Sequence, residues 1–305
     1  MAINVELKER LESALEKYGI SKAKASRDMG YSDSMLSLYT TEKYTGDVPK
    51  LEEAILRWLA RQEQARSRKK VPIAETAAMK VYTNAIRMAH AEKDIALIVA
   101  DAGSSKTTAA RRYADENPKT VMLIQVAGSG MNRKALIQEM ATQLGVDYHR
   151  VPQHTLIRNV ADTLASRDSL VIIDEADYLK VDALEFVRRI VYDLGESGLV
   201  LIGLPRLRGM IQNLRNDHRQ LESRIGICLH TTGLDKADAK LIASGIWPQV
   251  KKEVVEAAFA VSGPDVRQFV KILERAQNTM AINELTEPSV EIIEMASSMV
   301  LRRRA

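Results

Sequence analysis

The fold of this chain is decided by residues 94–107, which read Asp94-Ile-Ala-Leu-Ile-Val-Ala-Asp-Ala-Gly103-Ser-Ser105-Lys106-Thr107. Residues 95–99 are uniformly apolar, as in a strand buried on both faces of a sheet, and a short turn containing Gly103 follows them. A helix that begins at Lys106 would direct its unpaired N–H groups and the positive end of its dipole at an anion. The stretch therefore predicts a P-loop, in which a strand, a phosphate-binding turn and a helix follow one another.

The residues of this turn are the types that hold a nucleoside triphosphate with Mg²⁺. Lys106 would neutralise the β- and γ-phosphates, and the Thr107 hydroxyl would hold the metal ion. The full signature has Gly at its first and sixth positions, where this chain has Ala100 and Ser105. A strand-turn-helix without a nucleotide is therefore the alternative interpretation. The nucleotide-binding residues predicted here are Ala102, Gly103, Ser104, Ser105, Lys106, Thr107 and Thr108.

A second motif supplies the acidic strand end that a P-loop site needs. Residues 169–178 read Ser169-Leu-Val-Ile-Ile-Asp174-Glu175-Ala-Asp-Tyr178, and their apolar run is typical of a buried parallel strand. Asp174 would hold the Mg²⁺ shell together with Thr107, and Glu175 would orient or deprotonate the attacking water. We therefore predict Asp174 and Glu175 as catalytic residues, with a solvated acidic cap after the strand as the alternative.

Length and composition indicate a multidomain protein without a membrane span. The chain has 305 residues, of which 46% are hydrophobic, enough for at least one sizeable core. No apolar stretch reaches membrane-spanning length and the start of the chain lacks the apolar core of a signal peptide, so we expect a cytoplasmic location. Cys228 is the single cysteine, which excludes a disulfide framework within one chain and favours a small buried apolar role.

Positive charge is concentrated in residues 61–70. This stretch carries five positive charges against one negative, which equals the net charge of +4 of the whole chain. A phosphate-contacting arm that includes Arg68, Lys69 and Lys70 is the functional interpretation, and a solvated basic linker is the alternative.

The N-terminal segment has the pattern of a helix-turn-helix. Within residues 21–39, small Ala25, Gly30 and Ser32 stand where a close helix contact, a turn and a helix cap are expected. We predict residues 33–39 as the recognition helix of a DNA-binding domain, with a helical protein-docking module as the alternative. The element has no Arg, Asn or Gln for bidentate base reading, so we expect little sequence preference. Its hydroxyl donors for phosphates or base edges are Ser32, Ser34, Ser37 and Thr40.

The rest of the chain alternates apolar strands with helices up to residue 203, which indicates a doubly wound α/β domain. Further strands are expected over residues 120–126, 170–173 and 199–202, and a helix over residues 181–192. Exposed basic residues between these elements are candidates for a DNA-lining surface, namely Arg133, Lys134 and Arg150.

The order of these motifs resembles the phage Mu B-type transposition target-selection proteins, which are AAA+ ATPases related to the TnsC- and IstB-like ATPases of transposons. The resemblance rests on the helix-turn-helix, the P-loop, Leu-Val-Ile-Ile-Asp-Glu-Ala-Asp, Gly-Leu-Val-Leu-Ile-Gly at residues 198–203 and Glu-Ser-Arg-Ile at residues 222–225, and it covers nearly the whole chain. It implies an AAA+ P-loop NTPase whose parallel sheet is flanked by helices, with an N-terminal helix-turn-helix domain and a C-terminal helical lid.

The resemblance also implies a division of the chain and two further site residues. We expect a helix-turn-helix domain at 1–65, a basic linker and leading helix at 66–93, an ATPase core at 94–233 and a lid at 234–305. Arg224 would be the arginine finger inserted into a neighbouring subunit's site, and Arg267 the lid residue that touches the γ-phosphate. Either arginine could instead be an ordinary surface charge.

The implied activity is ATP-dependent, largely sequence-nonspecific DNA binding with ATP and Mg²⁺ as cofactors. The partners implied are double-stranded DNA, a transposase and further copies of the chain in a helical filament. One departure stands against simple transfer, because the position after the strand at residue 203 usually carries a polar sensor and here is Leu204. With Ser105, this predicts slow hydrolysis. A helicase-loader ATPase and a non-hydrolysing DNA-binding regulator are the alternative functions.

Overall fold

A computed structural model of the chain describes residues 3–67, 71–126, 128, 130–212, 219–231 and 233–300. Arg68, Lys69 and Lys70, which the sequence offers as DNA contacts, lie outside these ranges. The chain divides into two compact units, Met1–Lys70 and Val71–Ala305, and each is described by itself.

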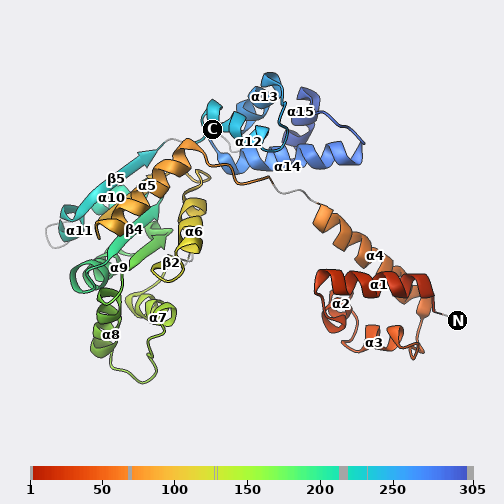
Figure 1. The fold of residues 1–305 in the computed structure, drawn as a ribbon, viewed down its shortest axis with the longest axis horizontal. Helices are drawn as coiled ribbons and strands as arrows, with labels where there is room; N and C mark the ends of the chain where they lie inside the picture. Colours follow the sequence, from red (N-terminus) through yellow and green to blue (C-terminus); the bar gives the residue numbers. More distant parts are fainter. Residues whose placement is uncertain are drawn as a thin grey trace. The chain divides into compact units, whose positions relative to one another are not determined.

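The first unit packs its helices around a core of its own (Figure 1). Trp58 is buried in that core, in keeping with its place on the apolar stripe of its helix, and Leu11 and Leu36 are completely buried beside it. The helices are α1 (Val5–Tyr18), α2 (Lys22–Asp28), α3 (Met35–Thr40) and α4 (Val48–Ser67).

The turn between α2 and α3 differs in detail from the predicted helix-turn-helix. Helix α3 begins at Met35 and not at residue 33, and Ser34 rather than Ser32 stands at its cap position, without a capping hydrogen bond from its side chain. Gly30 adopts a φ of 81°, which few residues other than glycine tolerate. The buried Ser26 hydroxyl accepts a hydrogen bond from the Leu36 N–H at 3.3 Å and so ties the two helices together.

The second unit is built on a parallel sheet whose strand order is β2-β3-β4-β1-β5. Strands β1 and β4 are buried along their whole length, as uniformly apolar sequences require in the middle of a parallel sheet. All carboxyl ends of the strands therefore meet at one edge of the sheet, where β1 leads into the P-loop. The strands are β1 (Ile95–Ala100), β2 (Val121–Gln125), β3 (Leu170–Asp174), β4 (Gly198–Gly203) and β5 (Ile225–Thr231).

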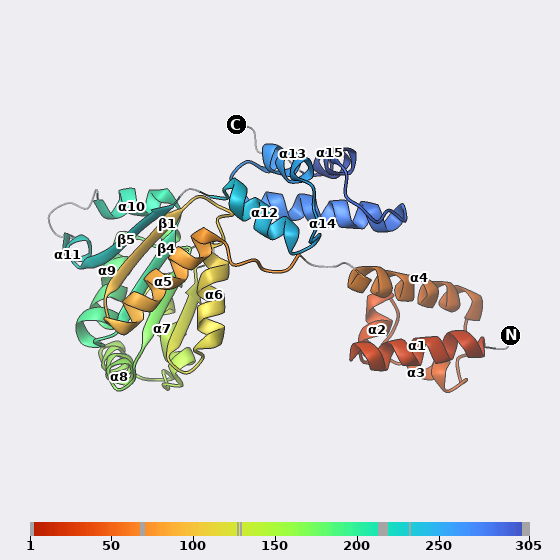
Figure 2. The same ribbon diagram turned by 45° about the horizontal axis from the view of Figure 1, so that its top comes forward.

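Helices cover both faces of this sheet (Figures 1 and 2). Helices α5 (Ala77–Ala91) and α6 (Lys106–Glu116) pack on the face formed by alternate strand residues such as Ile98 and Ile172. The other face, with Leu97 and Val171, is covered by a second group of helices. That group consists of α7 (Arg133–Leu144), α8 (Gln153–Ala165), α9 (Val181–Arg188), the π-helical turn η2 (Arg189–Leu194) and α10 (Pro205–Gln212).

Two features of this unit are not apparent from the sequence pattern. The weak alternation of residues 225–231 predicts no strand, yet β5 pairs in parallel with β1 at the edge of the sheet. Cys228 lies on β5 and is exposed, so the expectation of a buried apolar role is wrong. The helix expected over residues 181–192 is also divided, because α9 passes into the π-helical η2.

The C-terminal helices of the second unit form a small separate core around Phe269, Leu273 and Ile293. The Leu234 N–H, at the start of this part, donates to the Pro264 carbonyl at 2.7 Å. A contact with the sheet-bearing part is the hydrogen bond from the Ala77 N–H, at the start of α5, to Asp238 Oδ1 at 2.8 Å. The helices are α12 (Lys236–Ser244), α13 (Lys252–Ser262), α14 (Val266–Ile282) and α15 (Val290–Ser298).

Candidate nucleotide site

A cavity of about 590 Å³ lies at the carboxyl edge of the sheet, between the P-loop and the C-terminal helices. It brings together every nucleotide-binding residue suggested by the first motif, the acidic pair of the second, and Arg267 from α14. Helix α6 supplies its amino end to this cavity, and short side chains there leave the N–H groups of the loop accessible to an anion. The predicted residues lining it are Ala102, Gly103, Ser104, Ser105, Lys106, Thr107, Thr108, Asp174, Glu175 and Arg267.

Lys106 is buried and folded back onto its own loop. Its Nζ donates to the carbonyls of Ala100 and Asp101 at 2.6 and 2.8 Å and to Ser104 Oγ at 3.2 Å. Burial lowers the pKa of the Lys106 ammonium, and the carboxylates of Asp174, Asp101 and Asp177 oppose that shift. An ammonium held by neutral carbonyls in a partly desolvated place is ready to exchange them for a phosphate.

The turn of the P-loop requires special backbone conformations. Ser105 has a φ of 68°, at the position where the signature has Gly, so a side chain occupies the left-handed region there. Gly103 has a φ of 81°, and a Cβ on it would lie 2.1 Å from Oδ1 of Asp265 at the start of α14. Only a glycine therefore allows the lid to approach the loop this closely.

Asp174 and Glu175 face the P-loop from the end of β3. Asp174 Oδ1 accepts the Glu175 N–H at 3.0 Å, while its buried Oδ2 has no hydrogen-bond partner among the described residues. A buried carboxylate oxygen without a partner fits an ion with its water shell, so Asp174 and Thr107 would hold Mg²⁺. Glu175 has a φ of 57°, in the left-handed region that residues other than glycine adopt uncommonly.

Asp177 is a further buried acid of this cavity that sequence reasoning missed. Its side chain is 2% exposed, accepts the Leu204 N–H at 3.2 Å and pairs with the Arg206 guanidinium at 2.6 Å. The Arg206 guanidinium also lies 4.7 Å from the Tyr178 ring centroid. Asp177 therefore connects the acidic segment after β3 to the end of β4 through the backbone of Leu204, a residue that has no polar side chain. The signal in the sequence is the second aspartate of Asp-Glu-Ala-Asp, which is Asp177.

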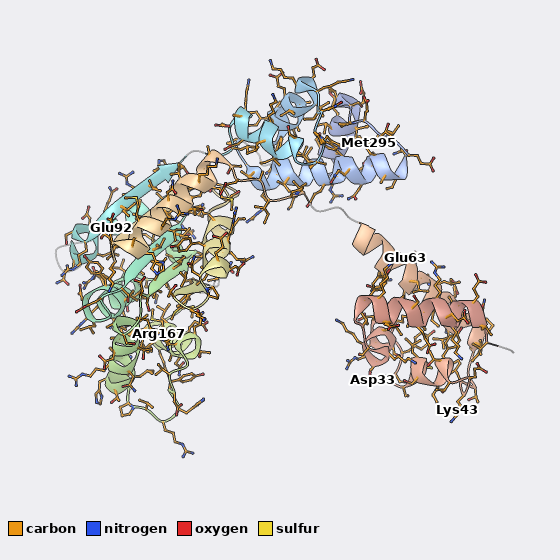
Figure 3. All side chains as sticks on the ribbon, viewed as in Figure 1. Asp33, Lys43, Glu63, Glu92, Arg167 and Met295 are labelled. Carbon is orange, nitrogen blue, oxygen red and sulfur yellow. The ribbon has the colours of Figure 1, made fainter. Side chains whose placement is uncertain are left out.

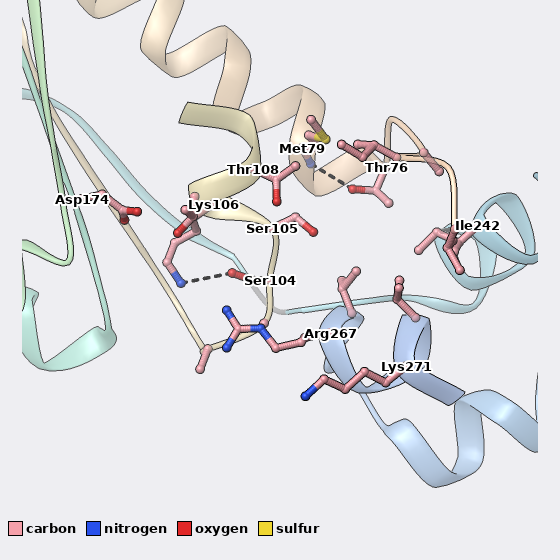
Figure 4. Close-up of a pocket in the computed structure, with 18 of the residues that line it drawn as sticks. Thr76, Met79, Ser104, Ser105, Lys106, Thr108, Asp174, Ile242, Arg267 and Lys271 are labelled. Carbon is pink, nitrogen blue, oxygen red and sulfur yellow. Dashed lines mark hydrogen bonds between the residues drawn. The ribbon is translucent and has the colours of Figure 1, made fainter. Parts of the chain in front are cut away.

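The lid contributes two cations from one face of α14. Figure 4 shows Arg267 extending from α14 toward the P-loop near Ser104, and Lys271, one turn further along, also lines the cavity. Arg267 lies close enough to Lys106 for its charge to lower the pKa of that ammonium. Lys271 carries no recognisable motif, although its spacing of four residues from Arg267 places it on the same helix face.

The segment before α5 and the lid also give the cavity apolar lining. Thr76 caps α5 by accepting the Met79 N–H at 3.2 Å, and Asp238 of α12 accepts the Ala77 N–H. The strap before α5, residues 71–76, is therefore held against the lid. An apolar wall beside a phosphate site suits a planar heterocyclic base. Sequence reasoning assigned this strap to the linker. The apolar residues of the wall are Val71, Pro72, Ile73, Ala74, Met79, Ile242, Val266 and Val270.

Arg224 does not line the cavity of its own chain. It follows α11 (Arg219–Ser223) and precedes β5, whose first residue pairs with Ile95 at the amino end of β1. The P-loop follows the other end of β1, about 17 Å away along the strand. Arg224 is partly exposed and its Nε lies 3.1 Å from Asp193 Oδ1.

The candidate DNA contacts within the described residues fall in different places. Ser32, Ser34 and Ser37 are exposed in the first unit, and the labelled Asp33 projects outward beside them (Figure 3). Thr40, in contrast, is buried, and its hydroxyl donates to the Ser37 carbonyl at 3.3 Å, so it is not an available donor.

The three basic candidates of the second unit are exposed but do not form one patch. Arg133 and Lys134 begin α7, whereas Arg150 lies in the loop after its other end, about 17 Å along the helix axis. Arg133 also pairs with Asp182 at 3.1 Å. The residues expected to line DNA therefore lie at the start of α7 and in the loop after it, and their role in DNA binding stays a prediction. Over the described ranges, no helix has both the length and the apolarity needed to cross a membrane.

Comparison with known proteins defines the class to which this fold and site belong. Residues 89–211 match the AAA domain family. The ORC2 protein of Aeropyrum pernix has a similar fold, with 18% identity over 75% of this chain and 67% of that chain and a TM-score of 0.56. The RuvB Holliday junction branch migration motor of Thermotoga maritima is also similar, with 18% identity over 76% and 72% and a TM-score of 0.51. The second unit therefore has the AAA+ P-loop fold.

Sequence relatives specify the family within that class. The ATP-dependent target DNA activator B of Escherichia phage D108 is 30% identical over 222 residues, which cover 71% of this chain and 70% of the relative. The protein of the same name from Escherichia phage Mu is 29% identical over 74% and 73% of the two chains. The Mu-like prophage FluMu DNA transposition protein B of Haemophilus influenzae is 26% identical over 83% and 89%. The chain belongs to the family of ATP-dependent target DNA activator B proteins.

Proposed function

We propose that this chain is an ATP-hydrolysing, DNA-binding protein that selects target DNA for transposition and recruits and activates a transposase. The names of the relatives, target DNA activator B and DNA transposition protein B, support the role in target activation. The observation that carries the ATPase role is the cavity in which Lys106, Glu175 and Arg267 meet.

Binding of ATP would begin with its phosphates at the amino end of α6. The Lys106 ammonium would leave the carbonyls of Ala100 and Asp101 for the β- and γ-phosphates, and Arg267 would approach the γ-phosphate from the lid. The adenine would lie against the apolar wall that includes Met79 and Ile242. Since phosphate contacts come from the loop and from α14, bound ATP would hold the lid in place.

Hydrolysis would then depend on Glu175. Its carboxylate would accept a proton from a water molecule that attacks the γ-phosphorus, and the bond to the β–γ bridging oxygen would break to give ADP and phosphate. Mg²⁺ bound by Thr107 and Asp174 would supply charge neutralisation for the phosphate oxygens. Ser105 in place of Gly and Leu204 in place of a polar sensor support a slow rate, which suits a timer.

Arg224 would act in the site of a neighbouring subunit. Its position near the amino edge of the sheet prevents it from reaching the phosphates of its own chain, while a second copy could present it to them. Such contacts join different surfaces of successive copies, and they produce a helical filament when they do not close into a ring. We propose that this filament surrounds double-stranded DNA and that DNA or transposase stimulates hydrolysis within it.

Mixed-subunit hydrolysis tests this arrangement. A Lys106→Ala chain keeps Arg224 but cannot hold phosphate, and an Arg224→Ala chain keeps its nucleotide site but lacks the arginine. Neither should hydrolyse ATP alone on DNA, because an arginine finger contributes roughly 10³ to 10⁵ in rate. Mixed together, they should regain activity at the interfaces where one chain supplies each part. Recovery no greater than the sum of the separate activities would disprove the trans arrangement.

Assembly and DNA binding need a separate measurement. Sedimentation of the parent chain with ATP and duplex DNA should show large, ATP-dependent complexes, with affinity that falls steeply with salt and changes little with sequence. Monomers under all conditions would contradict the filament, and a strongly preferred site in footprinting would contradict nonspecific binding.

A further inference from the structure

The part of the molecule that carries Arg224 contains a buried cation that the proposed mechanism does not use. Arg188, the last residue of α9, has a side chain only 4% exposed. Its Nε donates to Glu185 Oε2 at 2.7 Å, its Nη1 pairs with Asp193 Oδ2, and its Nη2 donates to Gln220 Oε1 at 3.0 Å. A buried guanidinium with a partner on each nitrogen fixes the relative positions of the groups around it.

The partners of Arg188 are the same groups that hold Arg224. Asp193 gives Oδ2 to Arg188 and Oδ1 to Arg224, whose Nε lies 3.1 Å away. Gln220 accepts from Arg188 with its side chain and from Arg224 Nη1, at 3.2 Å, with its backbone carbonyl. Arg224 Nη2 has no hydrogen-bond partner within the described ranges. The guanidinium is therefore held at one side, while the side that a phosphate would contact stays available.

The π-helical turn explains how Asp193 reaches this place. Arg188 and Asp193 are five residues apart, and in an α-helix each residue turns by about 100°, so two such side chains would point to different faces. A π-helix pairs residues five apart, as the 2.9 Å hydrogen bond from the Gly195 N–H to the Ile190 carbonyl shows. Asp193 consequently lies over Arg188 and faces Arg224.

Glu185 extends the same support to the helix before Arg224. Its Oε2 binds Arg188, and its Oε1 accepts the N–H of Leu221, a fully buried residue of α11, at 3.0 Å. Because Arg224 follows α11 directly, the α9–η2 segment and α11 are joined through one charged network. A displacement of either element would change the direction of the Arg224 side chain.

We propose that Arg188 and Asp193 are positioning residues for Arg224, which set the direction in which its guanidinium enters the nucleotide site of the next subunit. This inference rests on the trans role of Arg224 in the proposed function. Neither residue would touch ATP, and both would act only through the arginine that they hold.

The test is a complementation experiment with Asp193→Asn, which removes the charge that bridges the two arginines. The variant should bind ATP with the parent's affinity as an isolated chain, because its own nucleotide site is unchanged. Its hydrolysis on DNA should fall, by less than the roughly 10³-fold or greater loss expected for Arg224→Ala. In the Asp193→Asn, Arg224→Ala double variant hydrolysis should be no lower than in Arg224→Ala alone.

Mixtures then show whether Asp193 acts through Arg224. Asp193→Asn mixed with Lys106→Ala should regain hydrolysis, since the second chain supplies a correctly held arginine to the intact site of the first. Asp193→Asn mixed with Arg224→Ala should not, because both chains lack the same part. Glu116→Gln, which breaks an exposed 2.9 Å ion pair with Arg112, is the matched control and should behave like the parent.

Each result has a distinct meaning. Parental hydrolysis by Asp193→Asn, or recovery when it is mixed with Arg224→Ala, overturns the inference while leaving the trans arginine intact. Failure of Arg224→Ala to complement Lys106→Ala overturns the trans role of Arg224 in the proposed function. If Asp193→Asn fails to bind ATP, Asp193→Glu takes its place, because it keeps a negative charge beside Arg188 and displaces the carboxylate by one methylene. The same two outcomes then decide.

Discussion

Lys106 holds its ammonium group against two carbonyls of its own loop until a phosphate competes for it. Because burial lowers the pKa of this ammonium, the group loses its proton at a lower pH than an exposed lysine does. The charged form binds phosphate, so affinity for ATP is complete below the lowered pKa and is lost as the pH rises through it. A bound triphosphate favours the charged form, and binding in that range takes up a proton.

The first prediction is therefore an alkaline loss of ATP affinity that belongs to Lys106. In calorimetric titrations at increasingly alkaline pH, the dissociation constant of the parent chain should rise before the pH reaches the ordinary pKa of an exposed lysine, with proton uptake on binding. Lys106→Arg should show weaker binding but a flatter profile, because arginine stays charged over this range. Parallel profiles for the two proteins would assign the pH dependence to another group.

Glu175 gives the second prediction. Glu175→Gln keeps the size of the side chain but cannot accept a proton, so hydrolysis on DNA should fall about 10² to 10⁴-fold while ATP binding persists. Phosphate release and nucleotide binding are the two measurements. Glu196→Gln is a matched control, because Glu196 is an exposed glutamate that also has a positive φ, of 43°. A Glu175→Gln chain with parental turnover would remove Glu175 from the mechanism.

The contact between the P-loop and the start of α14 gives the third prediction. Gly103→Ala would place a methyl group 2.1 Å from Asp265 Oδ1 in a backbone of φ 81°, so the Asp265 side chain, the loop or the lid must move. We expect the dissociation constant for ATP to rise about tenfold or more, equivalent to at least about 1.4 kcal/mol. Filter binding or calorimetry measures it.

A second glycine separates backbone strain from lid contact. Gly145 at the end of α7 has a φ of 73° and nothing within 4 Å of an added Cβ. Gly145→Ala should lower the melting temperature through strain alone and leave ATP binding unchanged. If both variants bind ATP equally well, the closeness of α14 to the loop has no part in nucleotide binding.

The elements that the sequence predicts best are those whose burial is uniform. Strands β1 and β3 are short apolar runs at the centre of the sheet, and their ends are the two motifs, so the residues at the carboxyl edge can be located from sequence. Strand β5 lies at the edge with alternating partial exposure, which leaves a weak pattern. Its position depends on pairing with β1, an interaction between residues far apart in the chain.

Other parts of the site depend on geometry that no local pattern records. The sequence of η2 is that of an ordinary helix. Arg188 and Asp193 can pair only because the π-helical turn brings residues five apart onto the same face, and the sequence does not indicate that turn. The apolar lining around Met79 and Ile242 likewise combines the segment around α5 with the lid, and more than 150 residues of sequence separate the two.

The two units of the chain give the fourth prediction. A chain that lacks residues 1–70 retains the cavity with Lys106 and Glu175, so ATP binding should be unchanged. Its affinity for duplex DNA should weaken but survive, because Arg133, Lys134 and Arg150 remain. The salt dependence should also be shallower, by about 0.9 in the logarithmic slope for each DNA phosphate that the first unit no longer neutralises.

Fluorescence anisotropy with labelled duplex DNA measures both the affinity and its salt dependence. A full-length Arg68→Gln, Lys69→Gln, Lys70→Gln variant is the control that separates the basic stretch from the helices before it. An unchanged DNA affinity in the shortened chain would show that the first unit has another partner, such as a protein.

The closed core of the first unit has a consequence for how such a protein can evolve. Trp58, Tyr39 and Leu11 are buried against other residues of the segment 1–70, which therefore has a hydrophobic core of its own. An ancestor could exchange it for a different module by recombination near residue 70 without rebuilding the nucleotide pocket. If the first unit binds DNA as proposed, its contacts with DNA can thus change between relatives while the nucleotide cavity stays the same.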